Sequence, residues 1–194
     1  MKNIKAISII LFYISLVFIF ENKISAQDTI QKITVIKKME LHKHDLGLGL
    51  GLDYGGIIGA KCAFIPVPFL SVFGGVGIQL GGIGWNTGIT WHILPVMSNH
   101  TFRPNIKIMY GINSSFYIEG KSEYNRQFTG FTPGCGLEMR FGRNKKHGMD
   151  VDLNFPLRTP GFWSHYNTIK NDPNVEKLNE PLPVAISIGY HKEF

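Results

Sequence analysis

Helical periodicity is missing from most of this sequence. After residue 27 no segment shows a sustained apolar repeat of 3.6 residues, so we expect no helical domain. Charged residues are also sparse, at 18% of the 194 residues, whereas aromatic residues make up 12% of the chain. This composition excludes a disordered chain, which would need more charge and fewer aromatics. The length suits one domain of ordinary size.

Concentrated positive charge is missing as well. The formal net charge is +6, but the basic residues are spread out and form no stripe with interleaved aromatic residues. We therefore expect no nucleic-acid partner. The alternating glycines of residues 46–52 lack a Lys-Ser/Thr end and a following helix, which excludes a phosphate-binding loop.

Cysteine is scarce, and the only two residues are Cys62 and Cys135. A disulfide is possible in an exported protein, but the strand pattern below places both on the outer face of distant strands. We therefore expect free, buried thiols. No His or Cys lies at metal-ligand spacing, and His42 with His44 is a weak metal signal in a basic segment. We expect no cofactor and no metal site.

The N-terminus has the three parts of a secretory signal. Lys2 and Lys5 are basic, residues 6–20 form an apolar core, and a cleavage site follows Ala26. A membrane anchor is the alternative, but this apolar run is shorter than the ~20 residues that a spanning helix needs. We expect a cleaved signal peptide over residues 1–26.

Eight runs in the rest of the chain alternate apolar with polar or small residues, which is the pattern of strands with two distinct faces. They are residues 46–54, 57–65, 69–80, 83–94, 102–113, 128–142, 148–157 and 183–194. Each run is near the ~9–11 residues that cross a bilayer at a tilt. The fold class predicted is all-β, an eight-stranded antiparallel up-and-down transmembrane β-barrel over residues 45–194. Residues 27–44 would form a periplasmic lead-in segment.

The connections between the runs fall into two sets. Residues 66–68, 95–101 and 143–147 are short, as periplasmic turns are, whereas the other set contains the two long connections, 114–127 and 158–182. Long loops of such barrels face the cell exterior. With an even number of strands, both ends of the barrel would lie on the periplasmic side.

The composition of the polar faces indicates whether they line the lumen or form the outer surface of the barrel. A soluble barrel would hide its apolar face around a ligand, whereas an outer-membrane barrel turns that face to lipid. The polar faces carry many glycines, which weaken an exposed strand but fit a narrow lumen. We therefore expect an interior charge network. Its predicted members are Lys61, Arg103, Lys107, Glu138, Arg140, Asp150 and Asp152.

An eight-stranded barrel has an interior that side chains just fill. These charges would pair with one another and not line an open pore. The turn at 143–147 would place Arg140 opposite Asp150 and Glu138 opposite Asp152. A proton or ion path is the alternative to a structural network, and we predict no useful conductance.

Aromatic residues on the apolar faces gather near both ends of the runs. Trp91, Phe102 and Phe141 lie toward one end, and Tyr54 and Trp85 toward the other. Two such girdles are expected at the two interfaces of a membrane.

The final run ends on Phe194 after apolar residues at every second position, including Ile188 and Tyr190. This pattern resembles the C-terminal signature of bacterial outer-membrane β-barrels, although Lys192 departs from it. Residues 46–194 as a whole resemble the small eight-stranded OmpA/OmpX-like barrels. The resemblance implies a Gram-negative outer membrane, contact with its lipid and recognition by the barrel assembly machinery.

The long connections carry the residues expected to make functional contacts. They contain Tyr117, Tyr124, Phe162, Trp163 and Tyr166. We expect these extracellular aromatics to meet lipopolysaccharide or a surface or envelope protein partner. The expected function is a non-enzymatic barrel with a structural or surface-interaction role.

Two other functions stay open. Some barrels of this family modify lipid A with a serine, a histidine and an acidic residue near the outer rim. Ser164, His165 and Asp172 are the candidates here, although a triad is defined in space and not by adjacency. The other alternative is a secreted soluble barrel that binds an apolar ligand.

Overall fold

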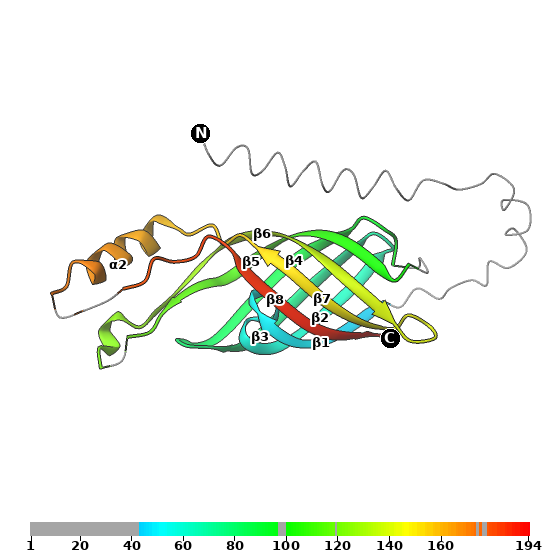
Figure 1. Cartoon of the computed structure of the whole chain (residues 1–194), viewed down its shortest axis with the longest axis horizontal. Coiled ribbons are helices and arrows are strands. Elements are labelled where there is room, and N and C mark those ends of the chain that lie inside the picture. The colour runs from blue at the N-terminus through cyan, green and yellow to red at the C-terminus, as the bar shows by residue number, and fades with distance from the viewer. Residues whose placement is uncertain (1–42, 97–99, 119, 174, 176–177) are drawn as a thin grey trace, which may run out of the picture. The chain divides into compact units, whose positions relative to one another are not determined.

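The computed structural model describes residues 43–96, 100–118, 120–173, 175 and 178–194. The predicted signal peptide and residues 27–42 of the predicted lead-in segment lie outside them. Eight antiparallel strands close into one barrel, each paired with its neighbours in the chain and β1 with β8 (Figure 1). The predicted all-β fold, an eight-stranded antiparallel up-and-down barrel, is confirmed. The strands are β1 His44–Gly51, β2 Gly56–Val67, β3 Leu70–Gln79, β4 Gly82–His92, β5 Phe102–Phe116, β6 Arg126–Phe141, β7 His147–Asn154 and β8 Ala185–Glu193.

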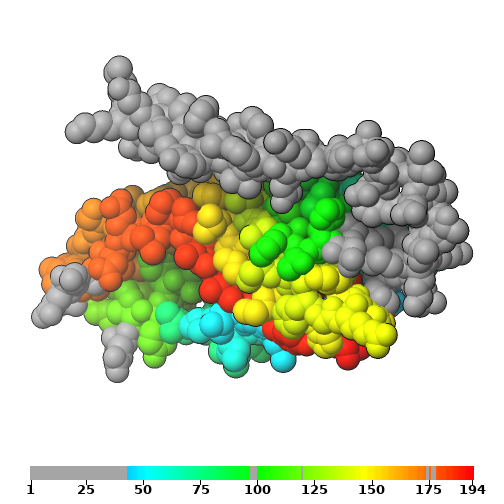
Figure 2. All heavy atoms as spheres, turned by 45° about the vertical axis from the view of Figure 1, so that its right-hand side comes forward, coloured from blue at the N-terminus to red at the C-terminus, as the bar shows by residue number. Residues whose placement is uncertain are grey.

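The barrel has two distinct ends. The terminal end carries His44, Phe194 and the β6–β7 turn, whereas the α2 end carries the helix α2, Pro160–Lys170. Figure 2 shows the β6–β7 turn in yellow and α2 in orange at opposite ends. Among the described residues, no helix has the length and apolar character needed to cross a membrane.

Burial is inverted relative to a water-soluble domain. Apolar side chains cover the outside of the wall, and Leu48 is 67% exposed and Ile188 is 45% exposed. Charged side chains fill the inside, where Arg103 and Glu138 are each 2% exposed. The alternation predicted from the sequence therefore separates the two faces as expected, with the apolar face outward.

The first strand is shorter than the sequence predicted, and its continuation enters the lumen. β1 ends at Gly51, where φ is 105°, and the 3-10 helix η2, Leu52–Tyr54, follows. A positive φ favours glycine because a side chain would clash there. Asp53 and Tyr54 are both 0% exposed. The prediction that Tyr54 belongs to an outer aromatic girdle is wrong, because the chain leaves the wall before this residue.

Glycines on the inner face make room for η2. A β-carbon on Gly189 would lie 2.0 Å from the Tyr54 hydroxyl oxygen, and one on Gly49 would lie 2.6 Å from the Tyr54 ring. A β-carbon on Gly59 would lie 1.8 Å from the Tyr54 carbonyl oxygen, and one on Gly75 would lie 2.4 Å from the Asp53 carbonyl oxygen. The glycine-rich inner face is therefore the surface on which η2 rests.

The β6–β7 hairpin has a different register from the one predicted. Glu138 lies opposite Asp150. The predicted pairs, Arg140 with Asp150 and Glu138 with Asp152, are wrong by two residues. Because His147 already pairs in β7, the turn is residues 142–146, and Gly142 and Lys145 take the positive φ values that it needs.

The connection between β7 and β8 contains a helix that the sequence analysis did not predict. In α2, Pro160 occupies the first turn, and Phe162, Tyr166 and Ile169 are buried on one face. Their spacing of four and three residues is that of a helix face, but the repeat is too short to stand out in the sequence. This face packs on Phe116 and Phe128 of the β5–β6 hairpin.

Because of this packing, some of the predicted loop contact residues are buried. Phe162 and Tyr166 are 2% and 7% exposed, so the prediction that they form an exposed contact surface is wrong. Tyr117 and Trp163 are 56% and 42% exposed, and Tyr124 is half-buried. Two of the five predicted contact residues therefore belong to a small core, against which Tyr124 and Trp163 pack.

The two cysteines are free, as predicted, but both are exposed. Cys62 pairs with Leu46 in the register of β1 and β2, and Cys135 pairs with Ile106 in that of β5 and β6. Both therefore belong to the apolar outer face, and the prediction that they are buried in the protein is wrong.

Replacing Gly189 with alanine tests the seat of η2. Its β-carbon would overlap the Tyr54 ring, and we expect a loss of about 1–3 kcal/mol in the free energy of unfolding, as for other overpacked sites. Urea unfolding of the barrel in lipid vesicles measures this loss. Gly74→Ala is the matched control, because its nearest neighbour would lie 4.0 Å away. Equal stability of the two variants would contradict the packing described.

Candidate functional site

Two arginines and two glutamates form the part of the network nearest the terminal end. Arg103 on β5 donates from Nε and Nη2 to the two carboxylate oxygens of Glu138 on β6, each at 2.7 Å. Its Nη2 also donates to Glu193 at 3.0 Å, and Arg140 donates to the other oxygen of Glu193 at 2.9 Å. Forked arginine–carboxylate pairs of this kind are geometrically specific as well as strong. They tie β5, β6 and β8 together across the lumen.

A second group surrounds Asp150 in the middle of the lumen. The Lys61 ammonium on β2 lies 2.7 Å from Asp150 Oδ2, and the Tyr54 hydroxyl donates to the same oxygen at 3.1 Å. The Lys61 ammonium also lies 4.8 Å from the centre of the Tyr54 ring. η2 thus supplies both a hydrogen bond and an aromatic face to a buried ion pair.

A third group lies toward the α2 end and centres on Lys107. Its ammonium pairs with Asp53 of η2 and lies 2.8 Å from Asp152 Oδ1. Asn154 donates to Asp53 at 2.7 Å and to the Ser187 hydroxyl at 2.9 Å. All five side chains are buried. One lysine therefore holds two carboxylates from different parts of the chain.

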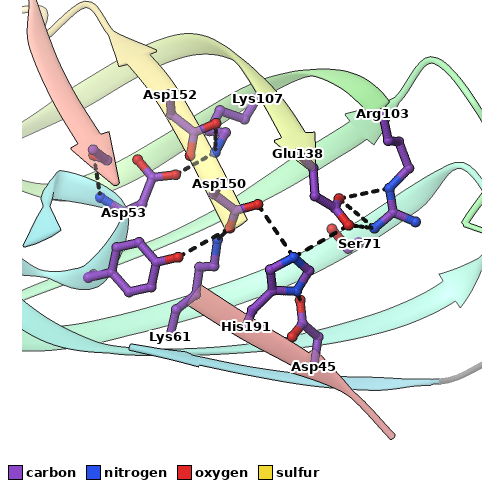
Figure 3. A network of polar contacts seen from close by, with 12 residues as sticks. Asp45, Asp53, Lys61, Ser71, Arg103, Lys107, Glu138, Asp150, Asp152 and His191 are labelled. Carbon is purple, nitrogen blue, oxygen red and sulfur yellow. Dashed lines mark hydrogen bonds and ion pairs between the residues drawn. The ribbon is translucent and has the colours of Figure 1, made fainter. Parts of the chain in front are cut away.

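His191 on β8 connects the first two groups (Figure 3). Its Nδ1 lies 2.8 Å from Asp45 Oδ2. Its Nε2 lies 3.4 Å from Glu138 Oε1 and 3.6 Å from Asp150 Oδ1. The imidazole is 2% exposed.

The structure places all seven residues of the predicted network inside the barrel. It adds five that the sequence analysis left out of that network: Asp45, Asp53, Tyr54, His191 and Glu193. Asp53, His191 and Glu193 lie on the polar side of the alternating pattern, and this signal could have found them. Tyr54 could not be found in this way because it follows the point where β1 ends.

The lumen is nearly filled by this network. The cavity that its residues line measures about 30 Å³, which is room for one or two water molecules. Burying an ion costs several kcal/mol unless it is paired with good geometry. The pairing described here meets that requirement for Lys61, Arg103 and Lys107.

The polar residues of the α2 end are arranged around Asp172. The Lys121 ammonium lies 2.6 Å from its carboxylate, and the Tyr124 hydroxyl donates to it at 2.9 Å. This hydrogen bond raises the pKa of Tyr124 above its ordinary value. The His165 ring nitrogen Nε2 lies 3.0 Å from the Tyr124 carbonyl oxygen. Ser164 is exposed on α2, and its carbonyl accepts a hydrogen bond from Thr168.

The predicted C-terminal signal lies on the outer face of β8 and just beyond it. Ile188, Tyr190 and Phe194 are 45%, 43% and 52% exposed. The Phe194 amide donates to the His44 carbonyl at 2.8 Å, so the last residue is still tied to β1. The Lys192 ammonium lies 4.9 Å from the Phe194 ring centre.

Comparisons with known proteins return little. No family model matches the sequence, and no curated protein matches it. Among solved structures, the N-terminal β-barrel domain of Pseudomonas aeruginosa OprF aligns with a TM-score of 0.43 and 8% identity, over 79% of this chain and 98% of that one. The fold assignment above comes from the strand pairing itself.

Lys107→Met tests whether the interior pairs matter for stability. It would leave Asp53 and Asp152 buried without their cation, and we expect a loss of about 3–5 kcal/mol in the free energy of unfolding. Lys107→Met combined with Asp152→Asn should recover part of this loss. Lys121→Met is the control, because its rim pair with Asp172 is more accessible and should contribute less than about 1 kcal/mol. Similar losses for both lysines, measured by urea unfolding, would contradict this ranking.

Proposed function

We propose that this protein is a non-enzymatic barrel of the bacterial outer membrane, which presents the α2 end to the cell exterior for contact with lipopolysaccharide or a surface partner. The observation that carries the proposal is the inverted burial of the barrel wall. In hydrocarbon every backbone polar group needs an internal partner, and a closed barrel satisfies all of them. An apolar outside with a charged inside is the arrangement of such barrels.

The aromatic residues of the outer face support a membrane position. Trp91, Phe102, Phe141 and Tyr190 lie near the terminal end of their strands and are 43–54% exposed. Tyr110 contacts both Trp85 and Phe131 further along the wall, with ring centres 6.3 Å and 5.0 Å apart. Aromatic rings are favoured at the interfaces between lipid and water.

The filled lumen supports a structural role over transport. The Tyr54 ring and the ion pairs of Lys61, Arg103 and Lys107 occupy the cross-section. Moving an ion through this region would require breaking several buried pairs. We therefore propose that the network stabilises the barrel and does not conduct.

The α2 end has the properties of a contact surface. Its core holds α2 against the β5–β6 hairpin, and Tyr117 and Trp163 project from this support with 56% and 42% of their surface exposed. Rigidly held aromatic side chains lose little freedom when they bind, and they are frequent among residues that dominate binding energy. This is the surface that we propose meets the partner.

Fractionation and site-directed labelling test the location and the orientation. We expect the protein in the outer-membrane pellet with heat-modifiable gel mobility. In a Cys62→Ala, Cys135→Ala background, a membrane-impermeant maleimide should label Thr168→Cys on intact cells, and should label Asn144→Cys in the β6–β7 turn only after permeabilisation. Recovery in the aqueous fraction would favour the soluble barrel, and the reverse labelling would invert the proposed orientation.

Mass spectrometry of lipid A separates this proposal from an enzymatic one. We expect the same lipid A species in the parent strain, a deletion strain and a Ser164→Ala strain, because the proposed role needs no nucleophile. Thr168→Ala is a matched control, since Thr168 is another exposed hydroxyl on α2. A species lost in both the deletion and the Ser164→Ala strain but kept with Thr168→Ala would establish the lipid A-modifying alternative.

A further inference from the structure

We propose that Glu138, Asp150 and His191 form a binding site for one divalent transition-metal cation inside the barrel. The three residues come from the adjacent strands β6, β7 and β8. One ligand atom from each lies within 4.8 Å of the other two, and all three side chains are buried. The spacing of these residues in the sequence gives no metal motif, because the strand pairing alone brings them together.

The distances between the ligand atoms suit a bound ion. His191 Nε2 lies 3.4 Å from Glu138 Oε1 and 3.6 Å from Asp150 Oδ1. Metal–ligand bonds of about 2.1 Å at a tetrahedral angle place two ligand atoms about 3.4 Å apart. These separations therefore leave space for a cation between the atoms. Figure 3 shows Nε2 pointing between the two carboxylates.

The position of His191 Nε2 is the second observation that points to a ligand. Nε2 is buried, and its nearest acceptors, Glu138 Oε1 and Asp150 Oδ1, lie at 3.4 Å and 3.6 Å. Both distances are longer than the ~2.9 Å of a good hydrogen bond, so a cation between the three atoms would give Nε2 a closer partner. A neutral imidazole with a lone pair on Nε2 is a metal ligand of common type.

Asp45 on β1 prepares His191 for this role. Its Oδ2 lies 2.8 Å from Nδ1, so Nδ1 can donate its proton there and leave the lone pair on Nε2. A carboxylate behind a metal-binding histidine orients the ring and raises its basicity. Asp45 is thus proposed as a positioning residue.

Gly148 provides the space for the imidazole. It pairs with His191 in the register of β7 and β8, and a β-carbon there would lie 1.9 Å from Nε2. The ring therefore reaches across β7 toward Asp150. A larger residue at 148 would push Nε2 away from both carboxylates.

Carboxylates outnumber lysines and arginines on the inner face of the barrel. The described inner face carries six carboxylates and four permanent cations. The carboxylates are Asp45, Asp53, Glu138, Asp150, Asp152 and Glu193, and the cations are Lys61, Arg103, Lys107 and Arg140. This excess of carboxylates favours a cation over an anion as the bound ion, because charge interactions are strong where the local dielectric is low.

The ligand types indicate the class of cation. One imidazole and two carboxylates suit Zn²⁺ and other first-row divalent ions, whereas Ca²⁺ and Mg²⁺ prefer oxygen ligands alone. The remaining oxygen of Asp150 is taken by Lys61 and Tyr54, so we expect Asp150 to bind through one oxygen. The cavity of about 30 Å³ lined by Glu138, Asp150 and His191 has room for one or two water molecules, which can complete the coordination.

Equilibrium binding of Zn²⁺ tests the site. The exported protein, folded in detergent and treated with EDTA, is titrated with Zn²⁺ by calorimetry, and the metal content is measured by elemental analysis. We expect one Zn²⁺ per chain, weaker binding of Mn²⁺, and none of Ca²⁺ or Mg²⁺. X-ray absorption at the zinc edge should show one nitrogen and otherwise oxygen ligands.

Variants identify the ligands, and heat-modifiable mobility confirms that each is folded. His191→Gln should abolish Zn²⁺ binding, and Asp45→Asn should weaken it about 10–100-fold, as loss of a supporting carboxylate does. His92→Gln is the matched control, because His92 is a buried histidine that lines the same cavity without joining the cluster. No binding of Zn²⁺ or Mn²⁺ to the folded parent would overturn the proposal and leave a protonated His191 as the partner of both carboxylates. Equal loss with His92→Gln would overturn the ligand assignment.

Discussion

The barrel wall depends on keeping charge paired in a lumen whose remaining cavity measures only about 30 Å³. The forked contact of Arg103 with Glu138, at 2.7 Å for both hydrogen bonds, joins two neighbouring strands, and Glu193 extends it to a third. Ions buried without partners would cost several kcal/mol each. The same pairs hold the charged side chains inside the barrel, and apolar side chains cover its outer face. The inner network and the outer apolar surface are two results of one alternation along each strand.

η2 shows how a short segment of the described chain fills the lumen. Three residues after β1 carry Asp53 to Lys107 and Tyr54 to Asp150, and the glycines of the inner face yield the space that their backbone occupies. Small residues on one part of the wall and long charged residues on another are therefore complementary in shape. The positions of the small residues are understood only together with those of the long charged residues.

The sequence predicted the strands and their faces well, because a period of two is unambiguous when both faces have distinct chemistry. Lys61, Arg103 and Asp152 could be assigned to the interior for this reason. The residue opposite Glu138 could not be predicted, since the register depends on how many residues the β6–β7 turn uses. The interior position of Tyr54 was not predicted, because the alternating sequence pattern continues past Gly51 whereas the strand ends there. α2 was missed because three buried apolar positions in eleven residues are a weak helical signal. Its stability comes from packing on Phe116 and Phe128.

The packing of Tyr54 is also linked to the closure of the barrel. Its ring rests on Gly49 of β1 and Gly189 of β8, which are direct partners where the first and last strands meet. Before β1 and β8 pair, the Tyr54 ring can pack on only one of these two glycines. We therefore expect the Tyr54 ring to become covered only when β1 pairs with β8. A chain in which these two strands had not yet paired would expose the Tyr54 phenol, which would report that the barrel is still open.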